Sequence, residues 1–520
     1  MKITYKYKIN GKEKERMYTY IPLRYILAIL ITLLEVSAII GIVIVMCLYV
    51  PYFYVLAYLT EMGCVLKIIS SDNNPDYKVP WLLVVLILPV IGFMLYFIFS
   101  SRTLKKKYVK KIQSLDKFGF NKDDTLLFNK INAEDDNAYR QAKMATNISG
   151  CHLYNNTSVK YFSSGEEYFE SLLIDLKNAD KFIFVDYFII EEGKFFDSVL
   201  EILKEKAKVG VEVKMVYDDI GCMKTLPANF QKRMSVYGIQ AVPFSRLKGG
   251  ADSEFNNRNH RKITVIDGKI GYTGGINLAD EYINHVKRFG HWKDSGVRLE
   301  GQAVWELTRL FVFDFGINVK ENLEFKNTLY PIISGTENGY VIPFGDGPNP
   351  IYDRNVGKCV IQNMLANASK YAYFTTPYLI MDNDLCNSIE SASLRGVDVR
   401  IIVPHIPDKK IVFGITKSFY SRLLKAGVKI YQYTPGFIHA KSYLVDDVYG
   451  LVGTINLDYR SLVHHFENGV WMYKTTCLKD LKSDILKTLE VSQEITADAN
   501  KPNLLVRFFR SIVRIFAPLL

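Results

Sequence analysis

Cysteine is scarce and unpatterned in this chain. Seven cysteines are spread over 520 residues, their number is odd, and no two of them form a Cys-x-x-Cys pair. A disulfide-stapled fold needs an even, regularly spaced set, and a zinc knuckle needs Cys-x-x-Cys steps. The sequence therefore argues against both, and the cysteines are expected to be buried or idle thiols.

Acidic residues are also in the minority. The chain has 65 Lys and Arg against 54 Asp and Glu, which gives a net charge of +11. A basic surface suits nucleic acid or anionic lipid, and the charge alone does not choose between them.

No small-residue cleavage site follows the first apolar segment, residues 23–49. This segment is too long for the apolar part of a signal peptide, so we expect a retained membrane span. Residues 81–99 are a second clean candidate. Residues 52–70 are apolar but contain Glu61 and Lys67, and could form a third span, a hairpin arm or an interfacial helix.

A basic segment flanks this apolar region on each side, at residues 2–24 and 102–111. Basic flanks favour the cytoplasmic side of a membrane. Two such flanks on one side require an even number of crossings. We therefore predict a multi-pass protein of the cell membrane with two full crossings and a cytoplasmic main domain.

An internal duplication follows. Three pairs of segments echo one another across the two copies: 181–188 with 370–377, 210–217 with 396–403, and 237–242 with 426–431. Each copy alternates helical patterns with buried strands, which predicts an α/β sandwich with largely parallel central strands. Two such halves facing each other would bring their last segments into one cleft.

These features divide the chain into five parts: a membrane anchor with two or three hydrophobic segments at 1–111, a polar linker at 112–158 with a helix expected around 133–146, two halves at 159–330 and 331–490, and a tail at 491–520. The tail places Arg507, Arg510 and Arg514 on one helical face, which suits a helix lying on an anionic bilayer. A helix docked on the protein's own core would have the same pattern.

One motif closes each copy. It contains a His, a Lys two residues later, an Asp five residues after the Lys, and an Asn beyond a glycine-containing loop. Its members are His260, Lys262, Asp267 and Asn277 in the first copy and His439, Lys441, Asp446 and Asn456 in the second. The residues between Lys and Asp are β-branched and alternate, as in a strand.

Strand geometry separates the roles of these residues. The His and the Lys point to one face of a strand, whereas the Asp points to the other, so we expect the Asp to be structural. In the first copy, Asp267 can start an Asp-Gly turn into the next strand. A helix is expected to begin at Leu278 and at Leu457, beside an Asn, and a helix N-terminus favours an anion. The motifs thus predict a phosphate site with two imidazoles. The lysines would repel a dication, which argues against a metal.

The paired motifs, their tails and the duplication resemble the phospholipase D superfamily. The match to bacterial cardiolipin synthases is closer still, covers nearly the whole chain, and includes residues 74–81, 217–221 and 456–461. The resemblance implies two tandem phospholipase D-like α/β halves that share one active-site cleft, preceded by transmembrane helices. It also implies that two phosphatidylglycerol molecules give cardiolipin and glycerol, with no cofactor, metal or nucleotide, and with membrane phospholipids rather than nucleic acid as partners.

The resemblance also assigns roles. The His, Lys and Asp of both motifs form the family's catalytic set, with His260 as the nucleophile that forms a phosphohistidine and His439 as the acid and then the base; the reverse order is chemically allowed. Each His needs an acidic partner on its other ring nitrogen. We expect Glu467 to serve the second half, as in the family, and choose Asp294 for the first.

Several alternatives stay open. They are a hydrolytic phospholipase D, another phosphatidyltransferase such as a serine-using one, a nuclease, and a membrane-anchored lipid-binding scaffold. The membrane segments argue against a nuclease, because a lipid substrate stays in the bilayer. Two intact motifs argue against a scaffold, because binding needs cations but not two imidazoles.

Overall fold

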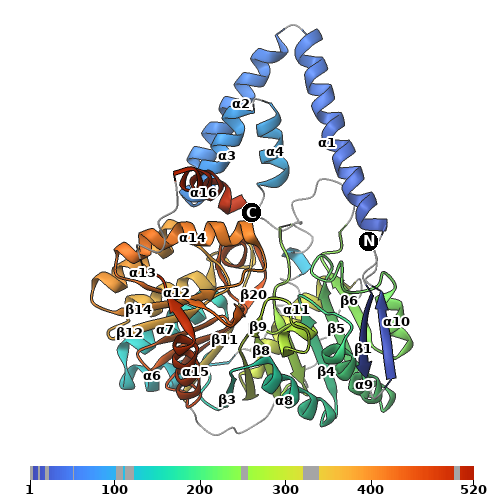
Figure 1. Cartoon of the computed structure of the whole chain (residues 1–520), viewed down its shortest axis with the longest axis vertical. Coiled ribbons are helices and arrows are strands. Elements are labelled where there is room, and N and C mark those ends of the chain that lie inside the picture. The colour runs from blue at the N-terminus through green and yellow to red at the C-terminus, as the bar shows by residue number, and fades with distance from the viewer. Residues whose placement is uncertain are drawn as a thin grey trace.

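Two mixed β-sheets, one in each copy of the duplication, form the body of the protein (Figure 1). The computed structural model describes residues 4–9, 12–17, 23–50, 52–88, 90–100, 109–111, 122–247, 256–319, 339–496 and 504–519. The prediction of two tandem α/β halves is confirmed.

The sheet of the first half has the strand order β3-β10-β8-β7-β4-β5-β6. The strands are β3 Thr157–Phe162, β4 Phe182–Tyr187, β5 Glu212–Asp218, β6 Gln240–Phe244, β7 Lys262–Ile266, β8 Ile270–Gly274 and β10 Gly296–Gly301. Only β4, β5 and β6 pair in parallel within this sheet. The expectation of largely parallel strands is therefore wrong, because β7 turns directly into β8 and hairpin neighbours are antiparallel.

The second sheet repeats this order as β11-β20-β18-β17-β12-β14-β15, with β21 added at its edge. The strands are β11 Tyr340–Asp346, β12 Tyr371–Thr375, β14 Asp398–Pro404, β15 Lys429–Tyr433, β17 Ser442–Val445, β18 Tyr449–Gly453, β20 Glu467–Tyr473 and β21 Ser492–Glu494. Each motif strand, β7 or β17, therefore occupies the same central place in its own sheet.

Helices cover both sheets. The first half has α8 Gly165–Lys177, α9 Lys194–Lys208, α10 Phe230–Val236 and α11 Val304–Gly316, and the second has α12 Val356–Ala366, α13 Asn383–Leu394, α14 Lys410–Lys425 and α15 Leu478–Glu490. One hydrophobic cluster contains side chains of both sheets, among them Phe184 and Val265 of the first and Leu444 and Val470 of the second. The halves therefore share a core.

Residues 122–153 contain the helix that we expected around 133–146, but they are not a polar linker. They form α6 Thr125–Glu134 and α7 Asp136–Ser149, and the buried apolar side chains of both helices belong to the core of the second half. The apolar positions of α7 are small: Ala138, Ala142 and Ala145. Such a helix packs closely against a neighbour, but its hydrophobicity is weak in the sequence.

The N-terminal region contains a short hairpin, β1 Thr4–Ile9 with β2 Lys12–Met17, and then α1 Leu23–Tyr49, α2 Phe53–Ser70, α3 Pro75–Ile87 and α4 Ile91–Phe99. Within the described residues, two helical segments are long and apolar enough to cross a membrane, Tyr25–Met46 and Phe53–Ser70.

The second clean span that we expected, residues 81–99, is instead broken between α3 and α4. The sequence has Pro89 at the break, and a helix is disfavoured at the residue before a proline. The two short helices fold back on each other so closely that a Cβ at Gly92 would lie 2.3 Å from the carbonyl oxygen of Val84. The second helix of spanning length is instead α2, in the segment 52–70 that we left open because it contains Glu61 and Lys67.

The anchor is attached to the body at its base (Figure 1). At the foot of α1, the Tyr25 hydroxyl donates to the backbone oxygen of Asp219 at 3.0 Å. At the foot of α3, Asn74 Nδ2 donates to Asp382 Oδ2 at 2.8 Å. The C-terminal helix α16, Leu504–Phe516, packs against both α14 and α3.

Candidate active site

The segments that carry the two histidines are held by the opposite half. In the first motif, the backbone N–H of His260 donates to the Phe466 oxygen at 2.9 Å. In the second, β16 Gly436–Ile438 pairs in parallel with β9 His291–Lys293, and the backbone N–H of His439 donates to Lys293 at 2.7 Å. Both histidines are 7% exposed, and they lie close enough for the charge of one to act on the other.

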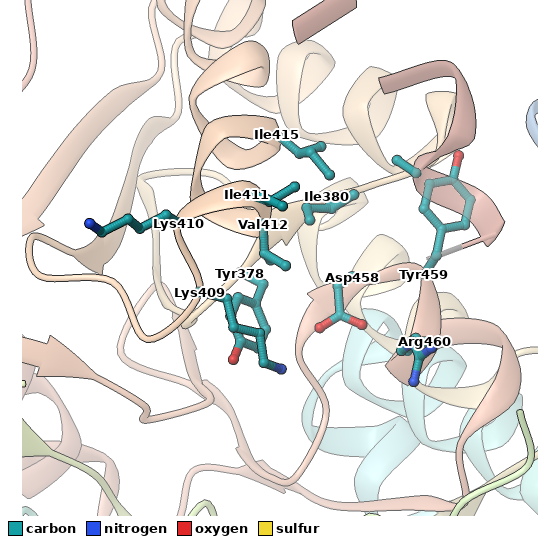
Figure 2. Close-up of a pocket in the computed structure, with 11 residues that line it drawn as sticks. Tyr378, Ile380, Lys409, Lys410, Ile411, Val412, Ile415, Asp458, Tyr459 and Arg460 are labelled. Carbon is teal, nitrogen blue, oxygen red and sulfur yellow. The ribbon is translucent and has the colours of Figure 1, made fainter. Parts of the chain in front are cut away.

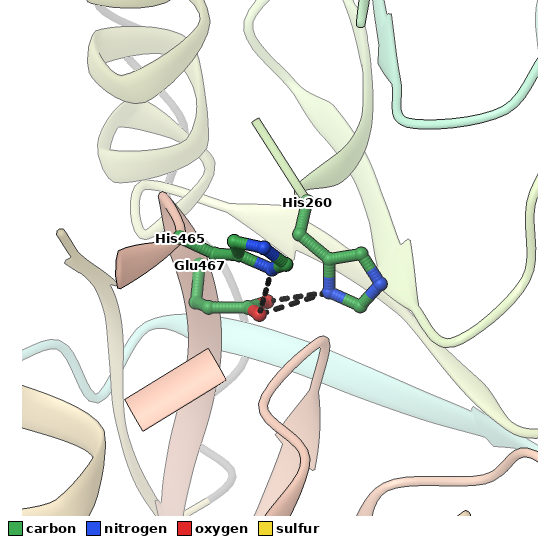
Figure 3. Close-up of side chains that lie close together, drawn as sticks. All are labelled: His260, His465 and Glu467. Atoms are coloured by element: carbon green, nitrogen blue, oxygen red, sulfur yellow. Dashed lines mark hydrogen bonds and ion pairs between the residues drawn. The ribbon is translucent and has the colours of Figure 1, made fainter. Parts of the chain in front are cut away.

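Each imidazole takes its carboxylate from the other half. His260 Nδ1 lies 2.9 Å from both carboxylate oxygens of Glu467 (Figure 3), and His439 Nδ1 lies 2.7 Å from Asp294 Oδ2. The acids are those that we expected, but the pairing within each half that we expected is wrong. A carboxylate on Nδ1 fixes the tautomer and leaves Nε2 as the nitrogen for a substrate.

Both motif lysines are fully buried beside these pairs. Lys262 Nζ donates to the backbone oxygen of His260 at 2.5 Å, and Lys441 makes the same bond to the oxygen of His439. Burial lowers the pKa of Lys262 to about 7 and that of Lys441 to about 8. Each ammonium has three donors, so both can still donate to a bound anion.

The site keeps its imidazoles neutral. Burial lowers the pKa of His260 well below its ordinary value, and the charges of Lys262 and Lys441 lower it further. Burial and Lys441 together lower the pKa of His439 to about 4. Burial alone would raise the pKa of Asp294, but His439 and Lys441 outweigh it and hold that pKa below its ordinary value. The site therefore has neutral imidazoles beside an ionised carboxylate.

The motif aspartates lie outside this group. Asp267, with φ 54°, accepts the backbone N–H groups of residues 180, 181 and 182 at 2.7–2.9 Å. Asp446, with φ 53°, accepts those of residues 369, 370 and 371 at 2.6–2.8 Å. Each caps the turn at the far end of its motif strand and ties it to the start of the neighbouring strand.

The motif asparagines are only partly available. Asn277 accepts from the Ile189 N–H at 3.0 Å and donates to the Tyr282 hydroxyl at 2.7 Å, which leaves one N–H of its amide for a phosphate. Asn456 is buried and hydrogen-bonds with Asp458, and its Oδ1 has no partner among the residues that the structure describes.

The helices that we expected directly after these asparagines do not form. Leu278 makes a β-bridge to Ile190, and Leu457 begins the short strand β19 Leu457–Asp458. The first turns that follow are a 3-10 turn at Asp280–Ile283 and a π-helical turn at Arg460–His464. No α-helix dipole therefore points at the site from the described residues 277–283 or 456–464.

Two residues that we did not expect from the sequence lie beside the histidines. His465 and Trp292 each lie two residues before a pairing acid. The Trp292 ring lies 5.4 Å from the His439 ring, and its Nε1 donates to Asp294 at 3.4 Å. The His465 ring lies 5.5 Å from the His260 ring, with Nδ1 3.8 Å from Glu467 (Figure 3). The shared offset from the two acids is the signal that could have found them.

The group His260, His465 and Glu467 brings its ligand atoms within 4.8 Å of one another, as a metal site would. The charges of Lys262 and Lys441 act on the same space, however, and would oppose a dication. Burial lowers the pKa of His465 to about 3, so this imidazole is neutral too.

A buried ionic network holds the loop before the first histidine. Arg258 donates to Asp218 at 2.9 Å, and Arg261 Nη1 donates to Asp314 at 2.7 Å. Between them, the Asn259 amide donates to both oxygens of Asp186 at 2.8 and 3.0 Å. Each of these six side chains is buried, so the backbone around His260 is fixed before any substrate arrives.

Two family models and a solved structure are similar to this chain. The family described as "Cardiolipin synthase, PLD-like domain" matches residues 172–287 and 361–489, and the family described as "Phospholipase D-nuclease N-terminal" matches residues 62–100. The crystal structure of phosphatidylserine synthase from Haemophilus influenzae has the same fold, with a TM-score of 0.55 and 15% identity over 73% of this chain and 98% of that one.

Relatives in sequence extend over almost the whole chain. An uncharacterised protein of Streptococcus mutans is 41% identical over 88% of this chain and 100% of its own length. A cardiolipin synthase of Halalkalibacterium halodurans is 32% identical over 89% of this chain and 92% of its own. A cardiolipin synthase of Staphylococcus aureus is 34% identical over 85% and 90%. This chain therefore belongs to the cardiolipin synthase family, whose members are phosphatidyltransferases with a phospholipase D-like domain.

Proposed function

We propose that the protein is a cardiolipin synthase, which transfers a phosphatidyl group from one phosphatidylglycerol to the headgroup of another and releases glycerol. The observation that carries the proposal is the pair of neutral, carboxylate-bound imidazoles flanked by two buried lysines. The cardiolipin synthases that are similar over most of this chain support the same substrate class.

In the first step, Nε2 of His260 attacks the phosphorus of one phosphatidylglycerol. A nitrogen–phosphorus bond forms, and the bond from phosphorus to the headgroup glycerol oxygen breaks with its electron pair. A proton from His439 goes to that oxygen, so neutral glycerol leaves. Lys262 and Lys441 stabilise the charge that develops on the non-bridging oxygens.

In the second step, His439 removes the proton from a headgroup hydroxyl of a second phosphatidylglycerol. The hydroxyl oxygen attacks phosphorus, the nitrogen–phosphorus bond breaks, and its electron pair returns to His260. The product is cardiolipin, and both histidines end as they began. The charge of the bound phosphodiester offsets that of the lysines, so it raises the pKa of His439 above about 4 and lets it hold the proton that the first step needs.

Burial favours an alcohol over water as the acceptor. Both histidines are 7% exposed and both lysines are at 0%, so bulk water has little access to the phosphorus. A lipid hydroxyl, by contrast, is delivered by the binding of its own headgroup. This observation ranks phosphatidyl transfer above hydrolysis.

We further propose that α1 and α2 cross the cell membrane as a hairpin and that the body lies on the cytoplasmic side. Both helices have their lower ends at the body (Figure 1), and basic segments flank the anchor on both sides. The amphipathic helix α16 would then lie at the membrane surface, because Leu505 and Phe508 on it are exposed.

The test is a mixed-micelle assay with labelled phosphatidylglycerol, no added metal, and chelator present. We expect cardiolipin and glycerol in equal amounts from the wild type and from His285→Ala, an exposed imidazole that serves as the matched control. His260→Ala and His439→Ala are expected to form neither product. Phosphatidic acid in place of cardiolipin would make the enzyme a hydrolase, and no turnover by folded wild-type protein would leave a lipid-binding scaffold.

A further inference from the structure

A cavity of about 700 Å³ lies in the second half, between the start of α14, the strand β13 Leu379–Ile380 and the chain that follows the second motif (Figure 2). Its size lies within the range of sites for small organic ligands. Ala517, after the C-terminal helix α16, contributes to its wall.

The cavity is apolar at one end and polar at the other. Ile380, Val412 and Ile415 gather at one end in Figure 2. Asp458 and the cationic groups of Lys409 and Arg460 lie at the other. A phospholipid has the same division, with a hydrocarbon chain on one side and a charged headgroup on the other.

The polar end is linked to the first histidine: the backbone oxygen of Arg460 accepts from the N–H of His465 at 2.8 Å, and the His465 ring lies 5.5 Å from the His260 ring. Asp458 is on β19, two residues after the motif Asn456, and its charge acts on Lys441. Lys409 carries a positive charge that acts on His260. A phosphate held between the histidines would therefore lie beside this end of the cavity.

The apolar end faces the elements of the anchor. α16 packs on α14 and on α3, and Tyr459 of the cavity wall donates through its hydroxyl to Asp76 of α3 at 3.1 Å. Ile411, which also lines the cavity, is 72% exposed, and exposure of an apolar side chain to water is unfavourable. The cavity thus connects the region of the helices that we place at the membrane with the candidate active site.

We propose that this cavity holds one acyl chain of a phosphatidylglycerol substrate while Lys409 and Arg460 face its headgroup. The assignment rests on the proposed function, and it adds a site that selects for chain length. A longer chain makes more contacts with the apolar wall of the cavity. A long-chain lipid therefore gains from the cavity, whereas a short-chain lipid gains little.

Binding can be tested without turnover. The full-length His260→Ala protein in detergent is irradiated with phosphatidylglycerol that has a diazirine at the end of one acyl chain, and the labelled peptides are mapped. We expect label on residues 410–415 and on Ile380, lost on competition with long-chain phosphatidylglycerol but not with glycerophosphoglycerol, which has the headgroup alone. Label confined to α1, α2 and the exposed side of α16 would overturn the proposal.

Catalysis gives a second test. Val412→Trp fills the cavity, and Ser421→Trp places the same ring on α14 away from it. For Val412→Trp we expect kcat/KM to fall about tenfold with long-chain phosphatidylglycerol, which corresponds to about 1.4 kcal/mol, and to stay near the control with the dihexanoyl lipid. Equal losses with both lipids in a variant of unchanged melting temperature would overturn the cavity assignment.

Ile411→Asp gives an independent check, because this exposed position tolerates substitution. We expect it, like Val412→Trp, to lower kcat/KM with long-chain phosphatidylglycerol and not with the dihexanoyl lipid. If the wild type made no cardiolipin from either lipid, the proposed function would fail, and the labelling experiment would still decide whether the cavity binds a chain.

Discussion

At the scale of single residues, the two imidazoles differ in their surroundings although they share a motif. His439 lies beside an indole and Asp294, whereas His260 lies beside a second imidazole and Glu467. A reaction that needs one nucleophile and one acid benefits from such a difference, because unlike environments separate the two roles.

An activated ester distinguishes the roles. Short-chain phosphatidyl p-nitrophenol needs no acid for its leaving group, so His439→Ala should release p-nitrophenolate in a burst of about one equivalent and stop as phosphohistidine. His260→Ala should give no burst. Rapid-mixing absorbance measures both. A burst from His260→Ala and none from His439→Ala would reverse the assignment.

The pairing of each histidine with a carboxylate of the other half predicts which step each acid affects: Glu467 acts on His260, and Asp294 acts on His439. Glu467→Gln should slow the burst on the order of 10²–10⁴-fold, because it leaves His260 without the partner that fixes its tautomer. Asp294→Asn should leave the burst with the activated ester and slow only the steady-state rate. The same stopped-flow traces report both, and an effect of Asp294→Asn on the burst alone would contradict the crossed pairs.

The lysine charges predict a titration shift. Burial is the largest cause of the low pKa of His439, about 4, and the charge of Lys441 is the second. Lys441→Met removes a positive charge that disfavours imidazolium, so the pKa should rise toward 6.5 without reaching it. NMR of ¹⁵N-histidine measures it, with the exposed Lys425→Met as control. An unchanged or lower pKa would show that Lys441 does not act on His439.

Much of this site could be predicted from sequence at the residue scale. The spacing of His, Lys and Asp on a strand places the first two together and the third apart, and the structure has this arrangement for both copies. The crossing of the carboxylates could not be predicted, because the pairing of Phe466 with the segment before His260 is a contact between halves. The contact of His465 with His260 could not be predicted for the same reason, because it joins the two halves.

At the scale of elements, the turns that begin at Asp267 and Asp446 tie each motif strand to the start of the neighbouring strand. Asp267 satisfies three backbone N–H groups with one carboxylate, at a residue with positive φ. The bond pattern recurs at Asp446, so the turn belongs to the repeated unit and not to one half.

Asp267→Ala should lower stability by about 2 kcal/mol, because three partly exposed N–H groups lose their acceptor and each hydrogen bond contributes about 0.5–1.5 kcal/mol. Asp446→Ala should do the same. Thermal unfolding in detergent measures the change, and the burst with the activated ester should persist in the folded fraction. A lost burst at unchanged melting temperature would give the aspartate a chemical role instead.

Two elements outside the repeated strands and helices of the halves were predicted wrongly. The segment 81–99 has the composition of a span, but the break at Pro89 and the close approach at Gly92 turn it into two short helices. After Asn277 no helix begins, because Leu278 forms a β-bridge with Ile190. In both places a tertiary contact overrides a local preference.

At the scale of the whole molecule, segments that precede the first half in sequence pack on the second half. α6 and α7 precede the first half but pack in the core of the second, and α3 of the anchor also contacts the second half. The duplication visible in the sequence therefore does not mark two separable folding units, and a cut between residues 320 and 338 would separate α6 and α7 from the core that they complete.

The hairpin anchor predicts the labelling pattern of single cysteines in intact cells. In a cysteine-free background, Tyr52→Cys at the far turn should react with an impermeant maleimide from outside. Asp72→Cys, at the end of α2, should react only after permeabilisation, because both feet of a two-crossing hairpin lie on the cytoplasmic side. Reaction of both from outside, or of neither, would contradict the hairpin.

The exchange of carboxylates between the halves has a consequence for the origin of the chain. A single copy holds an imidazole without an acid and an acid without an imidazole, so an ancestor with one copy had to work as a homodimer, each subunit completing the other. Symmetry obliges both sites of such a dimer to be identical. Fusion into one chain removed that obligation, and Trp292 in one copy with His465 in the other is a difference that no symmetric dimer can have.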